Sequence, residues 1–230
     1  MLGSLALVGS GEFLPAMSDF EKSLIDDGVN NGKAARYVQI PTAAGQESAE
    51  RLQYWENLGR TQAELLNVEP HFLPIFTRDD AHNPAFIDAI ADSALMYMSG
   101  GDPHYLAETL IDTPVWKAIE NNWRTGASLA GCSAGAMAMS AHIPNFRFTK
   151  REPTPGLNLL STIRVIPDPR TDTDFAIFCS VSSSASNTPD PNGNESPWRS
   201  FKRFTPWFAL MILTLLICTA NHWQSQRLED

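Results

Sequence analysis

The chain has 230 residues, 43% of them hydrophobic, and a formal net charge of −9. This length favours one main domain with an appendage and allows a sizeable buried core. The acidic charge argues against a nucleic-acid partner, because phosphate binding requires clustered Lys and Arg.

The cysteines and the N-terminal residues indicate the cellular compartment in which we expect the protein. Cys132, Cys179 and Cys218 are an odd, scattered set rather than a disulfide framework, which favours a reducing compartment and a cytoplasmic protein. The start, MLGSLALVGSGEF, lacks a positively charged region and has a very short apolar run, so we interpret it as a first strand and not a signal peptide. The scattered His and Cys residues predict no metal site, and we expect no cofactor.

Up to about residue 139, short apolar runs alternate with helical patterns. We expect strands at 5–9, 35–40, 68–73, 94–98 and 128–131, and helices at 17–27, 48–66, 84–91, 105–111, 115–124 and 134–139. Ser48 suits the N-cap of its helix. Alternating strands and helices indicate βαβ units and a three-layer α/β domain with a mostly parallel sheet. Tyr54, Trp55, Trp116 and Trp123 lie at helical spacings, and we expect them in the core.

The sequence Gly131-Cys132-Ser133-Ala134-Gly135 carries the chemistry. A G-x-S-x-G sequence between a strand and a helix is typical of a nucleophile elbow, whose sharp turn exposes the Ser hydroxyl. The helix N-terminus favours the negative charge that develops on a substrate oxygen. We therefore predict Ser133 as a nucleophile, with a tight strand–helix turn as the alternative. Cys132 should point into the sheet.

A second feature, Gly100-Gly101-Asp102, follows an earlier strand, and ligand sites lie at the carboxyl ends of such strands. The amides of Gly101 and Ala134 are the candidate oxyanion donors. Asp102 is either a substrate contact or a helix N-cap, and Glu12, after the first strand, should line the same cleft. The residues after that strand lack the dinucleotide-binding pattern G-x-G-x-x-G.

Taken in order, VGSGEF, IPTAAG, YMSGGDPHYL and LAGCSAGAM resemble the dipeptidase E and cyanophycinase family of serine peptidases, also described as type 1 glutamine amidotransferase-like proteins. The resemblance covers about residues 5–167. It implies a class I glutamine amidotransferase-like fold with Ser133 in place of the amidotransferase Cys. It also implies cleavage of short or unusual peptide bonds, often next to an acidic residue, without a metal.

One expected residue is missing. The family supplies a catalytic His about 35 residues after the serine, just past a strand, but the sequence here is Arg164-Val165-Ile166-Pro167-Asp168. Asp168 therefore stands where the resemblance expects the His. His104 could face the pocket instead, whereas a helix continuing past Ser133 would place His142 on its far side. Glu152 falls where the family carries an acidic triad partner.

Beyond residue 167 the composition changes. Residues 168–203 are rich in Ser, Asn and Pro and are typical of a disordered linker, so we expect the family's last strands and helices to be incomplete here. Residues 204–230 form an apolar tail, whose segment 204–220 is just long enough for a membrane span. Lys202 and Arg203 would then keep the domain in the cytoplasm. A segment packed on the domain is the alternative.

These observations support three hypotheses. The first is a serine hydrolase that cleaves small peptide or isopeptide-like amide bonds. The second is a non-catalytic relative that keeps the pocket and binds a ligand. The third, a glutamine amidotransferase, fits less well because the central residue is Ser133 rather than Cys.

Overall fold

A five-stranded parallel sheet forms the centre of the protein, in a computed structural model that describes residues 1–9, 11–145, 152–161 and 165. Its strand order is β1-β5-β4-β2-β3, and every neighbouring pair is parallel. The strands are β1 (Leu5–Val8), β2 (Ala34–Ile40), β3 (Glu69–Phe72), β4 (Ser93–Met98) and β5 (Ser128–Cys132). All five predicted strands are confirmed, with no end shifted by more than one residue.

Most of the helices that connect these strands begin at a residue whose side chain caps the first turn. They are α1 (Ser18–Asn30), α2 (Ala49–Leu65), α3 (Pro84–Ile90), α4 (Pro103–Leu110), α5 (Pro114–Arg124) and α6 (Ala134–Ala138), with short 3-10 turns η1 (Pro15–Met17), η2 (Thr42–Ala44) and η3 (Asp80–His82). Ser48 caps α2 as predicted, since its side chain accepts a hydrogen bond from the Arg51 amide. Asn83, Asp102 and Thr113 cap α3, α4 and α5, each followed by a proline, a residue suited to the first helical position.

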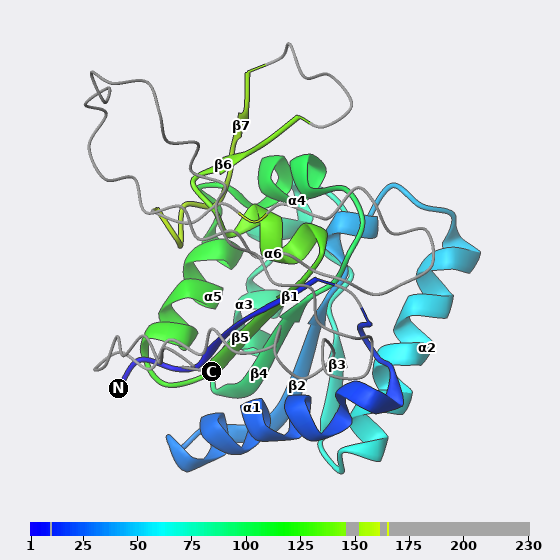
Figure 1. Cartoon of the computed structure of the whole chain (residues 1–230), viewed down its shortest axis with the longest axis vertical. Helices are drawn as coiled ribbons and strands as arrows, with labels where there is room; N and C mark the ends of the chain where they lie inside the picture. Colours follow the sequence, from blue (N-terminus) through cyan, green and yellow to red (C-terminus); the bar gives the residue numbers. More distant parts are fainter. Residues whose placement is uncertain (10, 146–151, 162–164, 166–230) are drawn as a thin grey trace, which may run out of the picture.

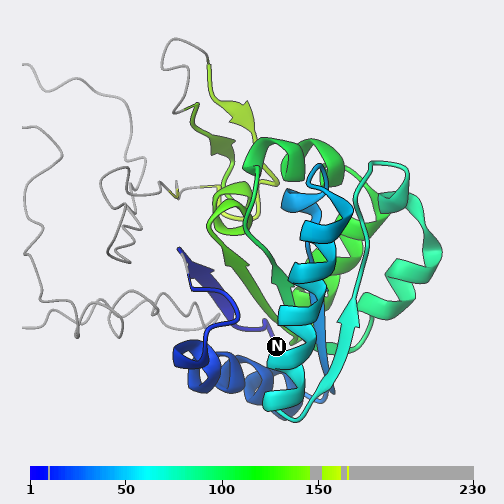
Figure 2. The same cartoon turned by 90° about the vertical axis from the view of Figure 1, so that its right-hand side faces the viewer.

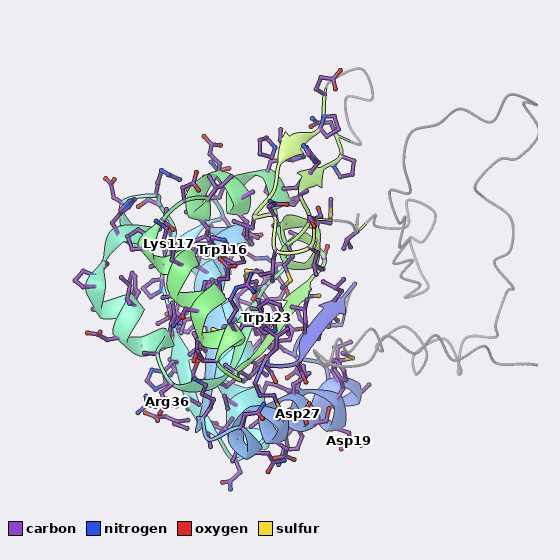
Figure 3. The ribbon with its side chains drawn as sticks, turned by 90° about the vertical axis from the view of Figure 1, so that its left-hand side faces the viewer. Asp19, Asp27, Arg36, Trp116, Lys117 and Trp123 are labelled. Carbon is purple, nitrogen blue, oxygen red and sulfur yellow. The ribbon has the colours of Figure 1, made fainter. Side chains whose placement is uncertain are left out.

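The two faces of the sheet are covered by different helices, because side chains alternate along a strand. In β4, Met96 and Met98 pack in the core that α3, α4, α5 and α6 cover, whereas Leu95 and Tyr97 pack in the core beneath α1 and α2. Trp116 and Trp123, labelled on α5 in Figure 3, belong to the first core. This arrangement confirms the predicted helix–sheet–helix layers.

Of the aromatic pair near the start of α2, Tyr54 does not lie in the core as predicted. Tyr54 is 49% exposed, and Trp55 is only partly buried. The Arg51 guanidinium lies 5.2 Å from the centre of the Tyr54 ring and 4.9 Å from that of Trp55. The pair therefore covers an arginine at the surface, while Trp55 also packs against the core beneath α1 and α2.

A small hairpin extends from the carboxyl end of the sheet. Strand β6 (His142–Ile143) pairs antiparallel with β7 (Thr154–Pro155), and both lie beyond α4 and α6 in Figures 1 and 2. Helix α6 ends at Ala138, so the prediction that placed His142 on the far side of a continuing helix is wrong: His142 is an exposed residue of β6.

The predicted linker (168–203) and apolar tail (204–230) lie outside the described residues, as does Asp168. Of the strand expected around residues 164–166, only Val165 is described, and it is buried. In the part of the chain that the structure describes, none of the helices combines the length and the apolar character needed to cross a membrane.

Candidate active site

Ser133 lies in the sharp turn between β5 and α6, as the sequence predicted. Its backbone angles, φ 48° and ψ −106°, fall outside the regions that non-glycine residues normally occupy. The Ser133 amide donates a 2.8 Å hydrogen bond to the carbonyl of Val8 in β1, which ties the turn to the sheet. Ser133 remains partly exposed.

The glycines on either side allow this turn to pack tightly. A Cβ atom on Gly131 would stand 2.6 Å from the backbone carbon of Gly135. A Cβ atom on Gly135 would stand 2.2 Å from the carbonyl oxygen of Met98 in β4. Since real Cβ atoms do not approach so closely, the strained serine is held by backbone packing that only glycine permits at these two positions.

The Gly100-Gly101 turn, which follows β4, faces Ser133. A Cβ atom built on Gly100 would meet Ser133 Cβ at 3.6 Å and Glu12 Oε1 at 3.5 Å. Gly101 has φ 141°, and a Cβ atom there would stand 2.4 Å from the Ala43 carbonyl oxygen. The fold thus brings together the two glycine-containing turns that the sequence singled out.

The two candidate oxyanion donors remain available. Within the described part of the chain, neither the Gly101 amide nor the Ala134 amide donates a hydrogen bond to another backbone group. Ala134 is the first residue of α6, where the orphan N–H groups and the helix dipole favour negative charge. The arrangement can therefore offer N–H donors beside a serine hydroxyl.

Glu12 reaches the same place from β1. Its Oε2 accepts a hydrogen bond of 3.0 Å from the Gly100 amide. Burial raises the pKa of the Glu12 carboxyl to about 7, and the hydrogen bond from Gly100 opposes that shift. The contact of Glu12 with the Gly100 backbone was not foreseen, and its place in a substrate cleft stays a prediction.

Asp102 and His104 are engaged in structural contacts. Asp102 is the N-cap of α4, because its Oδ1 accepts hydrogen bonds from the amides of His104 (2.8 Å) and Tyr105 (3.1 Å). The Nδ1 of His104 lies 2.6 Å from Thr154 Oγ1 in β7, so this ring nitrogen connects α4 to the hairpin. Of the two alternatives for Asp102, the structure provides direct contacts for the cap.

Two further histidines have partners elsewhere, and the residue expected as the acidic triad partner lies at the surface. His71 is paired with Glu69, His82 with the Arg78 carbonyl, and Glu152 is exposed. Cys132 is buried under the α1 face of the sheet, as predicted, and burial raises its thiol pKa far above the usual value. Among the described residues, no group of three or more His, Cys, Asp or Glu side chains is arranged to hold a metal ion.

A buried acid network next to the site was missed. Glu21 of α1 is fully buried, and its Oε2 accepts hydrogen bonds from Gln62 Nε2 (2.9 Å) and Tyr37 OH (3.4 Å). Burial raises the pKa of Glu21 to about 7. A signal was available, because Glu21 shares one helical stripe with Leu24, Ile25 and Gly28, where an acid is out of place.

Comparison with known proteins shows which family this chain belongs to. Residues 5–167 match the family description "Peptidase family S51". The chain belongs to this family. That is the dipeptidase E and cyanophycinase family of serine peptidases, so the predicted resemblance is confirmed and the fold is that of a hydrolase family.

Individual relatives agree with the family assignment. The cyanophycinases of Trichormus variabilis and of Nostoc sp. are each 27% identical to this chain over 117 residues, which cover 49% of the chain and 37% of each relative. The match thus spans little more than a third of these curated relatives.

Two solved structures share the fold. A peptidase from an acI-B1 Actinobacterium is 57% identical, with a TM-score of 0.71, over 73% of this chain and 68% of that one. A putative peptidase E from Listeria monocytogenes EGD-e is 21% identical, with a TM-score of 0.53, over 73% of this chain and 79% of that one. The second likeness concerns the fold alone.

Proposed function

We propose that the protein is a serine hydrolase that cleaves small peptide or isopeptide-like amide bonds, with Ser133 as its nucleophile. The strained backbone of Ser133 at the β5–α6 junction, with the residue partly exposed, carries the proposal. Such strain costs free energy and is typically kept where a side chain must be presented to a ligand. Membership of a serine peptidase family supports the same chemistry.

The neighbouring amides support a step of acyl transfer. When Ser133 Oγ attacks a substrate carbonyl, the carbonyl oxygen becomes negative, and N–H groups of Gly101 and Ala134 would stabilise it. One such donor is typically worth about 10²–10³ in rate. The hydroxyl also needs a base to accept its proton. His104 is a weaker candidate than its sequence position suggested, because its Nδ1 is paired with Thr154.

A fluorophosphonate probe, which reacts with activated serines, tests the proposal. We expect the full-length protein to be labelled and Ser133→Ala to lose all labelling while remaining folded. Ser23→Ala provides the control, since Ser23 is an exposed serine of α1 that hydrogen bonds to the Phe20 carbonyl. A label that survives in Ser133→Ala would contradict the assignment.

A second candidate is the non-catalytic relative that binds a ligand in the same cleft. The pairing of His104 with Thr154 favours it, because this histidine is then occupied in holding the hairpin. Folded wild-type protein that takes up no probe would favour this candidate. If the wild type is labelled, short peptides with an acidic residue next to the scissile bond are the first substrates to compare.

A further inference from the structure

Glu12 spans the end of the strand that carries the proposed nucleophile. It follows β1, whereas its hydrogen-bond partner Gly100 follows β4, 88 residues away. In the sheet, β5 lies between β1 and β4. The Glu12 carboxyl therefore crosses the carboxyl end of β5, at a distance of no more than about 7 Å from Ser133 Cβ.

The peptide of Gly101 is fixed between two anchored amides. On one side the Gly100 amide donates to Glu12, and on the other the Asp102 amide donates to the Ala43 carbonyl at 2.8 Å. Gly101 itself has a left-handed φ of 141° and packs against the Ala43 carbonyl. The Ala43 carbonyl is a backbone group and cannot change its charge, whereas the Glu12 carboxyl is ionisable.

We propose that Glu12 is a positioning residue, whose carboxyl group holds the Gly100 amide and thereby orients the Gly101 N–H beside Ser133. The consequence for rate rests on the proposed function, because it requires the Gly101 N–H to be an oxyanion donor. The anchoring itself is a property of the folded protein and can be measured without any substrate.

The charge state of Glu12 gives the anchor a recognisable signature. An ionised carboxylate accepts a stronger hydrogen bond than a protonated one, so the Gly100 contact tightens as the pH rises. Burial, which raises the Glu12 pKa to about 7, puts this change in an accessible pH range. The groups that face Glu12 are Cys132 of β5, Tyr97 of β4, Tyr37 of β2, Glu21 of α1 and Glu47, which is paired with Arg51.

Amide NMR spectra of the full chain between pH 5.5 and 8.5 test the anchor. In the wild type we expect the Gly100 amide proton to shift with a midpoint near pH 7. Glu12→Gln should remove that step, and Glu12→Ala should displace the signals of both Gly100 and Gly101. Glu47→Gln is the matched control: it removes a neighbouring charge without touching Gly100 and should keep the step. A step that persists in Glu12→Gln would overturn the proposal.

Probe labelling separates this proposal from the proposed function. We expect Glu12→Ala to label about 10²-fold more slowly, the loss of one oxyanion donor, and Glu12→Gln to recover to within about tenfold of the wild type. Equal labelling of Glu12→Ala and wild type would overturn the positioning role. If the wild type takes up no probe while its Gly100 amide proton still shifts near pH 7 and loses that shift in Glu12→Gln, the hydrolase proposal fails. The anchoring of Gly100 by Glu12 is then upheld.

Discussion

The two turns that meet at Ser133 keep their shapes by different means. The β5–α6 turn is fixed by backbone packing, in which Gly131 approaches Gly135 and Gly135 approaches the Met98 carbonyl. The β4–α4 turn is fixed largely by polar side chains, since Glu12 holds the Gly100 amide and Asp102 caps α4. Both turns include close backbone packing, since Gly101 of the second turn also packs against the Ala43 carbonyl oxygen, but only the second turn depends on an ionisable side chain as well.

This difference separates what each turn tolerates. A turn built by close packing resists changes of pH but fails when a methyl group is added. A turn that also depends on a carboxyl group responds in addition to protonation or to the loss of an acceptor. Substitutions in and around the two turns should therefore differ both in size and in their dependence on pH.

The largest effect is expected for Gly135→Ala. The added Cβ atom would stand 2.2 Å from the Met98 carbonyl oxygen, a backbone atom of the central strand that cannot move aside. We expect the free energy of unfolding to fall by about 4 kcal/mol or more, at every pH, in urea denaturation. Loss of soluble protein would be the extreme form of the same result.

Gly32→Ala is the matched control for this change. Gly32, unlike Gly135, has a left-handed φ, of 88°, but a Cβ atom there meets nothing within 4 Å. Only the backbone strain of about 1 kcal/mol should remain. If both variants lost the same stability, the close packing of the β5–α6 turn would not be what holds it.

A smaller effect, with a pH dependence, is expected for Glu21→Gln in the acid network beside the polar turn. The folded-state pKa of Glu21, about 7, lies above its ordinary value of 4.5. Protonated Glu21 therefore favours the folded state, and this contribution is complete below about pH 4.5 and lost as the pH rises to about 7. The loss is of the order of 3 kcal/mol.

Glutamine resembles the protonated acid and cannot ionise, so Glu21→Gln should be more stable than the wild type at pH 8, by up to about 3 kcal/mol, and similar to it near pH 4.5. Urea unfolding at several pH values measures both proteins. The side-chain amide oxygen of the introduced glutamine can still accept the hydrogen bonds that Gln62 and Tyr37 donate to Glu21. A variant destabilised equally at all pH values would show that Glu21 is held in its ionised form.

Local sequence patterns were sufficient to predict the strands, the helices and the turn that contains Ser133. Continuous apolar runs such as residues 94–98 predict buried parallel strands, and G-x-S-x-G between a strand and a helix predicts the turn. The sequence left Asp102 as either a substrate contact or a helix N-cap. The hydrogen bonds that its side chain accepts from the following amides favour the cap. Each of these features depends on residues close together in sequence.

Local patterns could not predict features that depend on the order of the strands in the sheet or on which face of a helix is buried. The contact of Glu12 with Gly100 requires β1 and β4 to flank β5, which no single segment specifies. Tyr54 has helical spacing but lies at the surface, because α2 covers the sheet with residues such as Leu58 and Ala63 instead. Spacing identifies a helix more readily than it identifies its buried side.

The smallest effect is expected at Asp102, and it distinguishes a cap from a substrate contact. Asp102→Ala removes the acceptor for the His104 and Tyr105 amides and should cost about 1 kcal/mol of stability. Asp102→Asn keeps an acceptor oxygen and should stay within a few tenths of the wild type. If Asp102 acts only as a cap, Asp102→Asn should also be labelled at the wild-type rate. Slow labelling of a stable Asp102→Asn would instead assign its charge to the cleft, which would make the β4–α4 turn part of substrate recognition as well as of the oxyanion site.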